Sequence, residues 1–159
     1  VAATGTRKDA YAVGTLTARE LRMLGINVDL APVLDINSNP KNPVIGVRSY
    51  GDNVNAASEY GIQMMKGLED GGILPVVKHF PGYGETVVDA HLGLPSVEKD
   101  LEGLKKCEFI PFKRVFREGA EAVMTAHVLF PNVEPRKIPA TMSKIFLTDI
   151  LRGELGFEG

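Results

Sequence analysis

The hydrophobic and polar positions along the chain predict helices and strands in strict alternation. Apolar residues at helical spacing, among them Val13, Leu16, Leu21 and Leu24, predict a first helix over residues 7–24. The same spacing predicts helices over residues 53–70 and 96–106, a restart with Pro111 in the first turn, and a last helix over 143–155 that Ser143 would cap.

Three apolar, β-branched runs separate these helices and predict strands over residues 26–36, 73–79 and 122–127. Pro32 interrupts the first run, so we expect its pairing to end near Ala31. Residues 37–53 are rich in Asn, Pro and Gly and predict a long loop, of the kind that is usually functional or disordered. Val47 and Tyr50 flank Arg48 in this loop and predict that it is ordered.

This alternation predicts an α/β fold with a parallel sheet and right-handed crossovers. Two architectures fit it, a (β/α)8 TIM-type barrel and an open doubly wound sheet. No G-x-G-x-x-G follows any predicted strand, which argues against the dinucleotide-binding version of the second. A barrel takes about 200 residues or more, so a chain of 159 residues would form part of one. We expect it to be truncated at both ends.

The composition narrows the classes of partner. The net charge is −2, which does not favour binding to nucleic acid or to an anionic membrane. No apolar run approaches the roughly 20 residues of a membrane span. Cys107 is the single cysteine, so an internal disulfide is excluded. A reducing compartment fits this, and we expect a cytoplasmic protein; export is the alternative, since a signal would precede Val1.

The polar residues with chemical potential follow the predicted strands. Lys78 and His79 end the second strand, and Asp89 and His91 follow in the next loop, separated by one residue. An aspartate can orient an imidazole and raise its basicity, which suits a general acid or base near neutral pH. The alternative is that both residues simply lie in solvent.

Lys78 and three other residues can be interpreted as functional or as structural. Lys78 could bind hydroxyl groups, form a Schiff base as in an aldolase, or extend into solvent from the sheet edge. Arg48 could hold an oxygen-rich ligand or be solvated. His127 ends the third strand and could line the same pocket or be buried and satisfied, and Asp35 could simply bind loop amides. No set of His, Cys and carboxylate residues has the spacing of a metal site.

The segment from Lys78 to Pro95, KHFPGYGETVVDAHLGLP, resembles the signature of glycoside hydrolase family 3, and most of all its bacterial β-N-acetylglucosaminidase branch. The segments ELRMLGINVDLAPVLDI, IGVRSYG, VMTAHV and LRGELGFEG agree with this, in the order of the family. The resemblance implies that residues 1–159 form part of the N-terminal catalytic barrel domain. It also implies retaining hydrolysis of terminal, non-reducing β-linked N-acetylglucosamine.

The same resemblance implies roles for individual residues. His91 would be the general acid/base and Asp89 its hydrogen-bonding partner. The residues that would bind the hydroxyl groups of the sugar or line its site are Arg48, Lys78, His79 and, at the end of the third strand, His127. The expected partner is a small carbohydrate, with no cofactor and no metal.

One catalytic group of the family has no counterpart in the sequence. The nucleophilic aspartate is expected on the strand after the L-G-F-x-G segment, beyond Gly159, and a further sugar-binding acidic residue is expected upstream of Val1. We therefore expect the chain alone to be inactive. The alternatives are a β-glucosidase of the same family, against which the D-x-H loop argues, and a half-barrel that binds sugar or assembles without catalysis.

Overall fold

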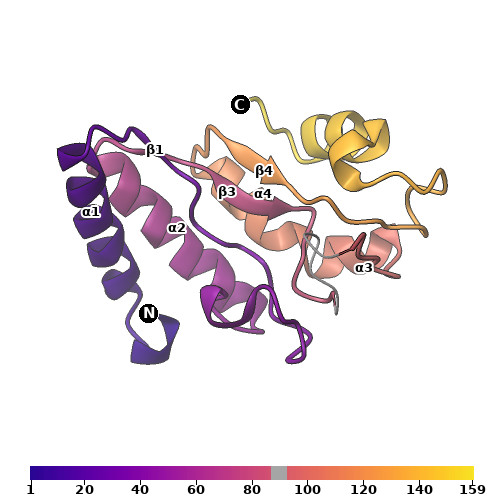
Figure 1. The fold of residues 1–159 in the computed structure, drawn as a ribbon, viewed down its shortest axis with the longest axis horizontal. Coiled ribbons are helices and arrows are strands. Elements are labelled where there is room, and N and C mark those ends of the chain that lie inside the picture. Colours follow the sequence, from indigo (N-terminus) through magenta and orange to yellow (C-terminus); the bar gives the residue numbers. More distant parts are fainter. Residues whose placement is uncertain (87–92) are drawn as a thin grey trace.

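The computed structural model describes residues 1–86 and 93–159 and shows helices and short parallel strands in alternation (Figure 1). The main elements are α1 (Arg7–Met23), β1 (Val28–Asp29), α2 (Val54–Asp70), β2 (Leu74–Pro75), β3 (Val77–Phe80), α3 (Leu101–Lys106), α4 (Phe109–Arg117), β4 (Val123–Thr125) and a last helix, η4 (Ile145–Glu154), wound as a π-helix. Short 3-10 turns form η1 (Ala2–Thr4), η2 (Gly46–Arg48) and η3 (Ala140–Met142).

The strands pair in parallel, in the order of the sequence. β1 pairs with β2, and β3, which follows β2 after a single residue, pairs with β4. Lys78 pairs with Met124 and Phe80 pairs with Thr125, the next residue of β4. The register therefore shifts at His79, which has no partner in the ladder. The three segments 28–34, 74–80 and 123–126 therefore lie side by side and end at one edge.

The prediction that pairing ends near Ala31 is wrong. The amide of Lys78 donates to the carbonyl of Pro32 at 3.0 Å, and the amide of Leu34 donates to the carbonyl of Lys78 at 2.6 Å. Pro32 lacks an amide proton but keeps its carbonyl, so it can still accept a hydrogen bond from the neighbouring strand. The first strand thus reaches the carboxyl edge of the sheet.

One main hydrophobic core joins the strands to the helices that cover them. Phe80 lies at its centre, with ring centroids 5.8 Å from Phe109 and 5.4 Å from Phe112. A doubly wound sheet would have a core on each face, whereas helices that share one core are typical of the wall of a barrel. Strand and helix residues both belong to this core: Val77, Phe80, Ala126, Met65, Phe112, Val115, Phe146, Ile150 and Leu151.

The buried face of α1 differs from the predicted one. Val13, Leu16 and Leu24 are 38%, 56% and 77% exposed, whereas small residues of the same helix are buried: Ala10, Gly14 and Ala18. The apolar spacing identified the helix but not the side that packs inward.

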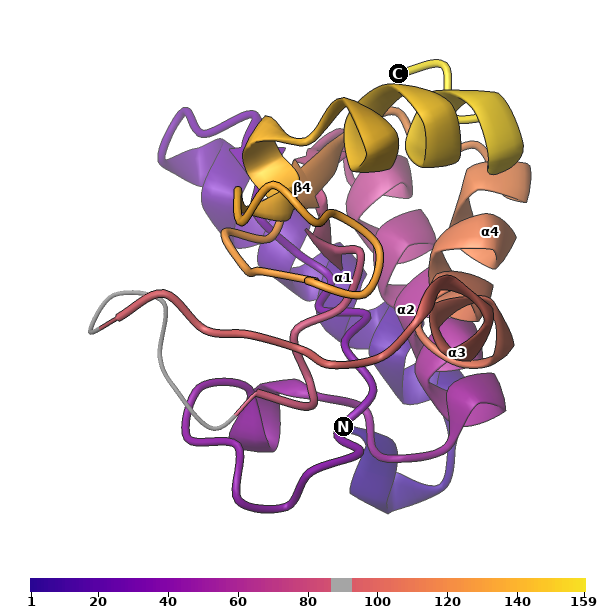
Figure 2. The same ribbon diagram turned by 90° about the vertical axis from the view of Figure 1, so that its right-hand side faces the viewer.

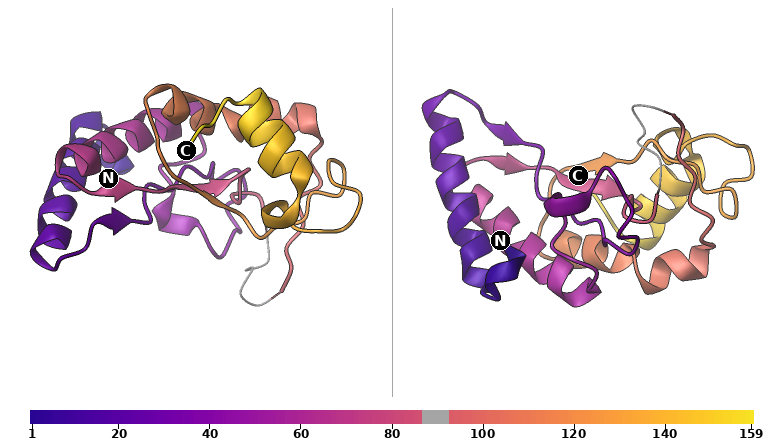
Figure 3. Two further views of the ribbon diagram at one scale, coloured as in Figure 1. Left: turned by 90° about the horizontal axis from the view of Figure 1, so that it is seen from above. Right: turned by 60° about the horizontal axis from the view of Figure 1, so that its bottom comes forward.

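Close approach of α1 to α2 explains this choice (Figures 1 and 3). A Cβ added to Gly67 would lie 2.3 Å from the carbonyl oxygen of Tyr11, and one added to Gly14 would lie 2.6 Å from that of Met64. At such a distance only small side chains fit directly between the two helices; Val13 and Leu16 stay exposed, whereas Leu21 packs against the cluster of Ala18, Leu68 and Ile73.

The third predicted helix begins later than expected. The Asp100 side chain accepts a hydrogen bond from the Gly103 amide at 2.8 Å and caps the short α3. Before this cap the chain is extended: the Val97 amide donates to the Leu129 carbonyl at 2.9 Å, and the Leu129 amide donates to the Pro95 carbonyl at 2.8 Å. Pairing with the segment after β4 therefore replaces the first turns of the predicted helix.

Two predictions about helix starts are confirmed. Pro111 lies in the first turn of α4, where no intrahelical amide bond is lost. The Ser143 hydroxyl accepts from the Phe146 amide at 3.3 Å, as an N-terminal cap does.

The contact between α1 and α2 gives a test of the fold. Gly67→Ala places a methyl group against the backbone of α1, so we expect the free energy of unfolding to fall by about 2 kcal/mol. Gly153→Ala is the matched control in η4, where the nearest atom to an added Cβ is 3.4 Å away; we expect it to be neutral or stabilising by up to about 1 kcal/mol. Urea denaturation measures both, and equal effects would contradict the packing described here.

Candidate functional site

A cavity of about 340 Å3 opens at the carboxyl edge of the strands. In Figure 2 this edge faces the viewer, together with the loops that follow each strand. The lining residues come from the loop 37–53, from the end of β3 and from β4: Val44, Arg48, His79, Tyr83, Met124, Thr125, Ala126 and His127. Three of the predicted site residues, Arg48, His79 and His127, are thus brought together from three separate segments.

His79 is held by a buried carboxylate. Its Nδ1 lies 2.6 Å from Oδ2 of Asp35, which is only 1% exposed, and its backbone amide donates to the same oxygen at 3.3 Å. The other oxygen of Asp35 accepts from the amide of Tyr83 at 2.7 Å. The Tyr83 ring meets the imidazole edge-on, with ring centroids 5.8 Å apart. The orientation of His79 is therefore fixed on two sides.

Arg48 is placed by a tightly turned segment. Its guanidinium donates to the Val44 carbonyl through Nη2 at 2.8 Å. The Asn42 side chain holds this turn, since its Oδ1 accepts from the amides of Val44 and Ile45, each at 2.8 Å. The Asn42 Nδ2 also donates to the carbonyl of Tyr83 at 2.8 Å. The buried side-chain amide of Asn42 thus connects the turn that contains Arg48, called here the Arg48 segment, to the loop after β3.

His127 lines the cavity from the segment that follows β4. Its Nδ1 is 2.8 Å from the Thr141 hydroxyl, in the loop that follows β4. A second buried carboxylate organises this loop: Glu134 binds the Arg136 guanidinium through both oxygens, at 2.8 and 2.6 Å, and accepts from the Ser143 hydroxyl at 2.6 Å. Arg136 chiefly, assisted by Ser143, lowers the pKa of Glu134 to about 2.

The role predicted for Lys78, contact with the same ligand as His79, stays a prediction. Lys78 is not among the described residues that line the cavity. Its side chain is half-buried, and burial, followed by repulsion from Arg48, lowers the pKa of its amine below the ordinary value. The structure therefore places the Lys78 amine close enough to Arg48 for the two charges to repel each other.

Asp89 and His91, the predicted catalytic pair, lie outside the described residues. The chain on either side of them is firmly anchored. Lys99 contacts Glu85 at 2.9 Å and the buried Glu108 at 2.6 Å. Burial lowers the pKa of Lys99, but the bonds to Glu108 and Glu85 outweigh it and raise that pKa above its usual range. Downstream, Pro95 is bound to Leu129, as described above.

The part of the chain that the structure describes contains no group of three or more His, Cys, Asp or Glu residues that could hold a metal ion. Within the same residues, no helix has the length and apolar character needed to cross a lipid bilayer.

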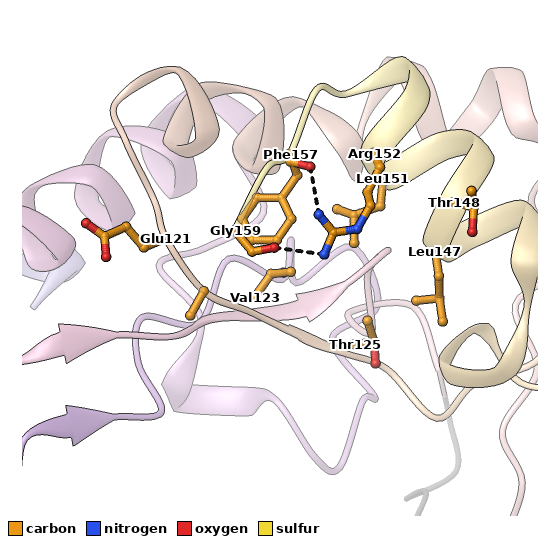
Figure 4. A pocket seen from close by; sticks show the side chains of 10 residues that line it. Glu121, Val123, Thr125, Leu147, Thr148, Leu151, Arg152, Phe157 and Gly159 are labelled. Carbon is orange, nitrogen blue, oxygen red and sulfur yellow. Dashed lines mark hydrogen bonds between the residues drawn. The ribbon is translucent and has the colours of Figure 1, made fainter.

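A larger hollow of about 520 Å3 lies along the other side of β4 (Figure 4). Val123, Leu151 and Phe157 give it apolar walls. The Arg152 guanidinium in this hollow is engaged by the protein itself, donating to the carbonyl oxygens of Phe157 at 3.4 Å and Gly159 at 2.8 Å. Two of the Arg152 nitrogen donors are therefore already engaged within the protein. Thr125 lines both this hollow and the smaller cavity, so the two are adjacent.

Comparison with known proteins shows the family to which the chain belongs. The family model described as the glycosyl hydrolase family 3 N terminal domain matches residues 1–159. Beta-hexosaminidase A of Pseudoalteromonas piscicida is 40% identical over 164 residues, covering 95% of this chain and 27% of that protein.

Solved structures agree. A glycoside hydrolase family 3 beta-N-acetylglucosaminidase from Paenibacillus sp. str. FPU-7 superposes with a TM-score of 0.97 at 49% identity, over 99% of this chain and 30% of that one. NagZ from Neisseria gonorrhoeae, solved in complex with N-trifluoroacetyl-D-glucosamine, superposes with a TM-score of 0.91 at 39% identity, over 98% of this chain and 45% of that one. The chain thus spans less than half the length of these relatives, and within that span it has the fold of part of their (β/α)8-type domain.

The sequence interpretation underestimated Asp35 and did not identify Tyr83 or Met124 as lining residues. For Asp35 a signal exists, because it follows one parallel strand and His79 ends the next, and the ends of adjacent parallel strands lie side by side. Binding of a loop amide, the simple interpretation of Asp35, is confirmed by its bond to Tyr83, but the bond to His79 adds a second role.

The lowered pKa of Glu134 predicts how stability depends on pH. A carboxyl whose pKa is lower in the folded than in the unfolded chain stabilises the fold above the unfolded value, and this stabilisation is lost as pH falls through the folded value. We expect the loss between pH 4.5 and about 2. Glu134→Gln should remove this part of the acid dependence and lower the free energy of unfolding at pH 7 by about 2 kcal/mol.

Urea denaturation at a series of pH values measures this effect. Glu20→Gln, at an exposed position on α1, is the control and should leave the acid dependence of the wild type in place. An unchanged acid dependence in Glu134→Gln would contradict the role given to this carboxylate.

Proposed function

We propose, from the premise that the chain belongs to glycosyl hydrolase family 3, that it forms part of the catalytic domain of an enzyme that removes terminal β-linked N-acetylglucosamine. The observation that carries the proposal is the cavity at the carboxyl edge, where Arg48, His79 and His127 converge. It occurs in a chain 49% identical to a beta-N-acetylglucosaminidase over 99% of its length.

The cavity suits a sugar in size and in chemistry. A pocket of about 340 Å3 lies within the range of small-ligand sites, which are mostly apolar with a few placed polar groups. The Arg48 guanidinium is a donor only, whereas an imidazole nitrogen can accept. Sugar hydroxyls act as both donors and acceptors, so the two residues complement them. Val44, Met124 and Ala126 supply apolar surface for the less polar parts of a sugar ring or its acetyl group.

The proposed mechanism is retaining hydrolysis in two steps. His91, oriented by Asp89, gives a proton to the leaving glycosidic oxygen while a carboxylate attacks the anomeric carbon and forms a glycosyl-enzyme. His91 then takes a proton from water, which attacks the same carbon and releases the carboxylate. Most retaining enzymes use a carboxylic acid as the proton donor, and this group becomes an anion when it gives up its proton. An imidazolium that gives up its proton becomes a neutral imidazole instead.

The nucleophilic aspartate is expected beyond Gly159, and the hollow beside β4 supports this expectation. The segment before Gly159 runs toward the start of β4, since a Cβ added to Gly159 would lie 2.0 Å from the carbonyl oxygen of Glu121. A following strand along β4 would fill the hollow and end beside Thr125, which also lines the sugar cavity.

The Schiff-base alternative has less support, because Lys78 does not belong to the described lining of the cavity. Its lowered pKa would favour a reactive amine, but a carbonyl substrate in this cavity would meet His79 and Arg48 first.

Calorimetric titration of the chain tests the proposal. We expect saturable binding of N-acetylglucosamine, weaker binding of glucose, and no release of the aryl group from an aryl β-N-acetylglucosaminide. Arg48→Ala should weaken the binding of N-acetylglucosamine at least tenfold, which corresponds to the roughly 1.5 kcal/mol of a hydrogen bond to a charged group. Arg19→Ala, at an exposed position on α1, should leave it unchanged.

Each other outcome contradicts a definite part of the proposal. The absence of binding at saturating sugar would remove the sugar site. Equal binding of glucose would favour the β-glucosidase alternative. Saturable turnover by the chain alone would show that the nucleophile does not lie beyond Gly159.

A further inference from the structure

Asp35 connects the segments that line the cavity through hydrogen bonds on both its side chain and its backbone. Its carboxylate accepts from the amide of Tyr83 on one oxygen, and from the ring and amide of His79 on the other. Its carbonyl accepts from the Ser49 hydroxyl at 2.8 Å, directly after Arg48. A single residue of the first strand therefore contacts the second strand, the loop after it and the Arg48 segment.

The chemistry of a carboxylate sets the protonation of the imidazole. An ionised Asp accepts hydrogen bonds and cannot donate them, so at 2.6 Å the Nδ1 of His79 must carry the proton. In the neutral ring Nε2 then has a lone pair, and it is the ring nitrogen left for a ligand of the cavity that His79 lines. His79 is thus prepared to accept a hydrogen bond, whereas Arg48 is prepared to donate one.

A residue of the same shape could not replace this carboxylate. Three N–H groups converge on Asp35, two from His79 and one from Tyr83. An asparagine offers one oxygen and one NH2 group, so one side would face a donor with a donor. If the NH2 group of the asparagine faces His79, the 3.3 Å hydrogen bond from the His79 backbone amide is lost. Nδ1 of His79 must then accept a hydrogen bond from this NH2 group, so the ring proton moves to Nε2.

We propose that Asp35 is a positioning residue of the sugar site. It holds His79 with Nδ1–H directed at the carboxylate, so that Nε2 accepts a hydrogen bond from a sugar hydroxyl, and it keeps Tyr83 and the Arg48 segment around that hydroxyl. The part of this inference that concerns the sugar rests on the proposed function, whereas the part that concerns the imidazole does not.

The tautomer of His79 is measured without any ligand. Long-range 1H–15N correlation spectra of the chain, at a pH where the ring is neutral, distinguish a protonated from an unprotonated ring nitrogen, and His79→Gln assigns the signals. We expect Nδ1 to be protonated and Nε2 unprotonated. A neutral ring that carries its proton on Nε2 would overturn the proposal.

Substitution separates the positioning role from general stability. Asp35→Asn should move the ring proton to Nε2 and weaken the binding of N-acetylglucosamine at least tenfold. Glu134→Gln is the matched control, since it also neutralises a buried carboxylate at this edge but contacts Arg136 and Ser143 instead; it should leave the His79 spectrum unchanged. If Asp35→Asn does not fold, the wild-type spectrum alone still shows which ring nitrogen of His79 carries the proton, and so still tests the proposal. If the Asp35→Asn variant folds and its His79 tautomer is unchanged, the proposal is overturned.

Titration of the wild-type chain with N-acetylglucosamine completes the test. We expect the Nε2 signal of His79 to shift on binding while Nδ1 stays protonated. If the predicted tautomer is found and no sugar binds, the proposed function fails and the positioning of His79 by Asp35 stands. If sugar binds and Nε2 does not respond, the proposed function stands and the role of Asp35 toward the sugar fails.

Discussion

Parallel pairing of residues 74–80 with a strand on each side is the constraint on which the site depends. The backbone of Lys78 bonds to Pro32 and Leu34 on one side, and β3 pairs with β4 on the other. Because parallel strands end at the same edge, this register brings Asp35, His79 and His127 together, although 92 positions separate the first from the last. A slip in either pairing would separate these side chains.

Buried polar groups then convert this edge into a site of defined geometry. Asp35, Asn42 and Glu134 are at most 5% exposed; Asp35 and Asn42 both bond Tyr83 in the loop after β3, and Glu134 bonds Ser143 in the loop after β4. An unsatisfied polar group at such positions would cost about 1–3 kcal/mol, so each loop is held in the one arrangement that supplies the partners. Loops of this kind are normally the most variable part of an α/β protein. Here they are fixed up to both ends of the segment that contains Asp89 and His91.

The sequence predicted the alternation of elements and the edge of the sheet where the chemistry lies, because both follow from local periodicity and from the polar residues at strand ends. It did not predict which face of α1 is buried, since that depends on the glycines of a second helix. It extended the third helix back to Ser96, because pairing of Val97 with Leu129 is a long-range contact that local spacing does not show. Arg48, His79 and His127 were predicted for one pocket and lie in one, whereas Lys78 does not line it. The two residues with the most specific predicted roles, Asp89 and His91, lie outside the described residues, so their roles stay predictions.

The central claim is that the edge organised by Asp35 holds a sugar. A crystal structure of the chain soaked with N-acetylglucosamine tests it most directly. The account predicts that the sugar occupies the cavity between Arg48, His79 and His127, with a hydroxyl within hydrogen-bonding distance of Nε2 of His79. Sugar bound instead in the hollow between β4 and η4, or an imidazole turned away from Asp35 to meet it, would contradict the account.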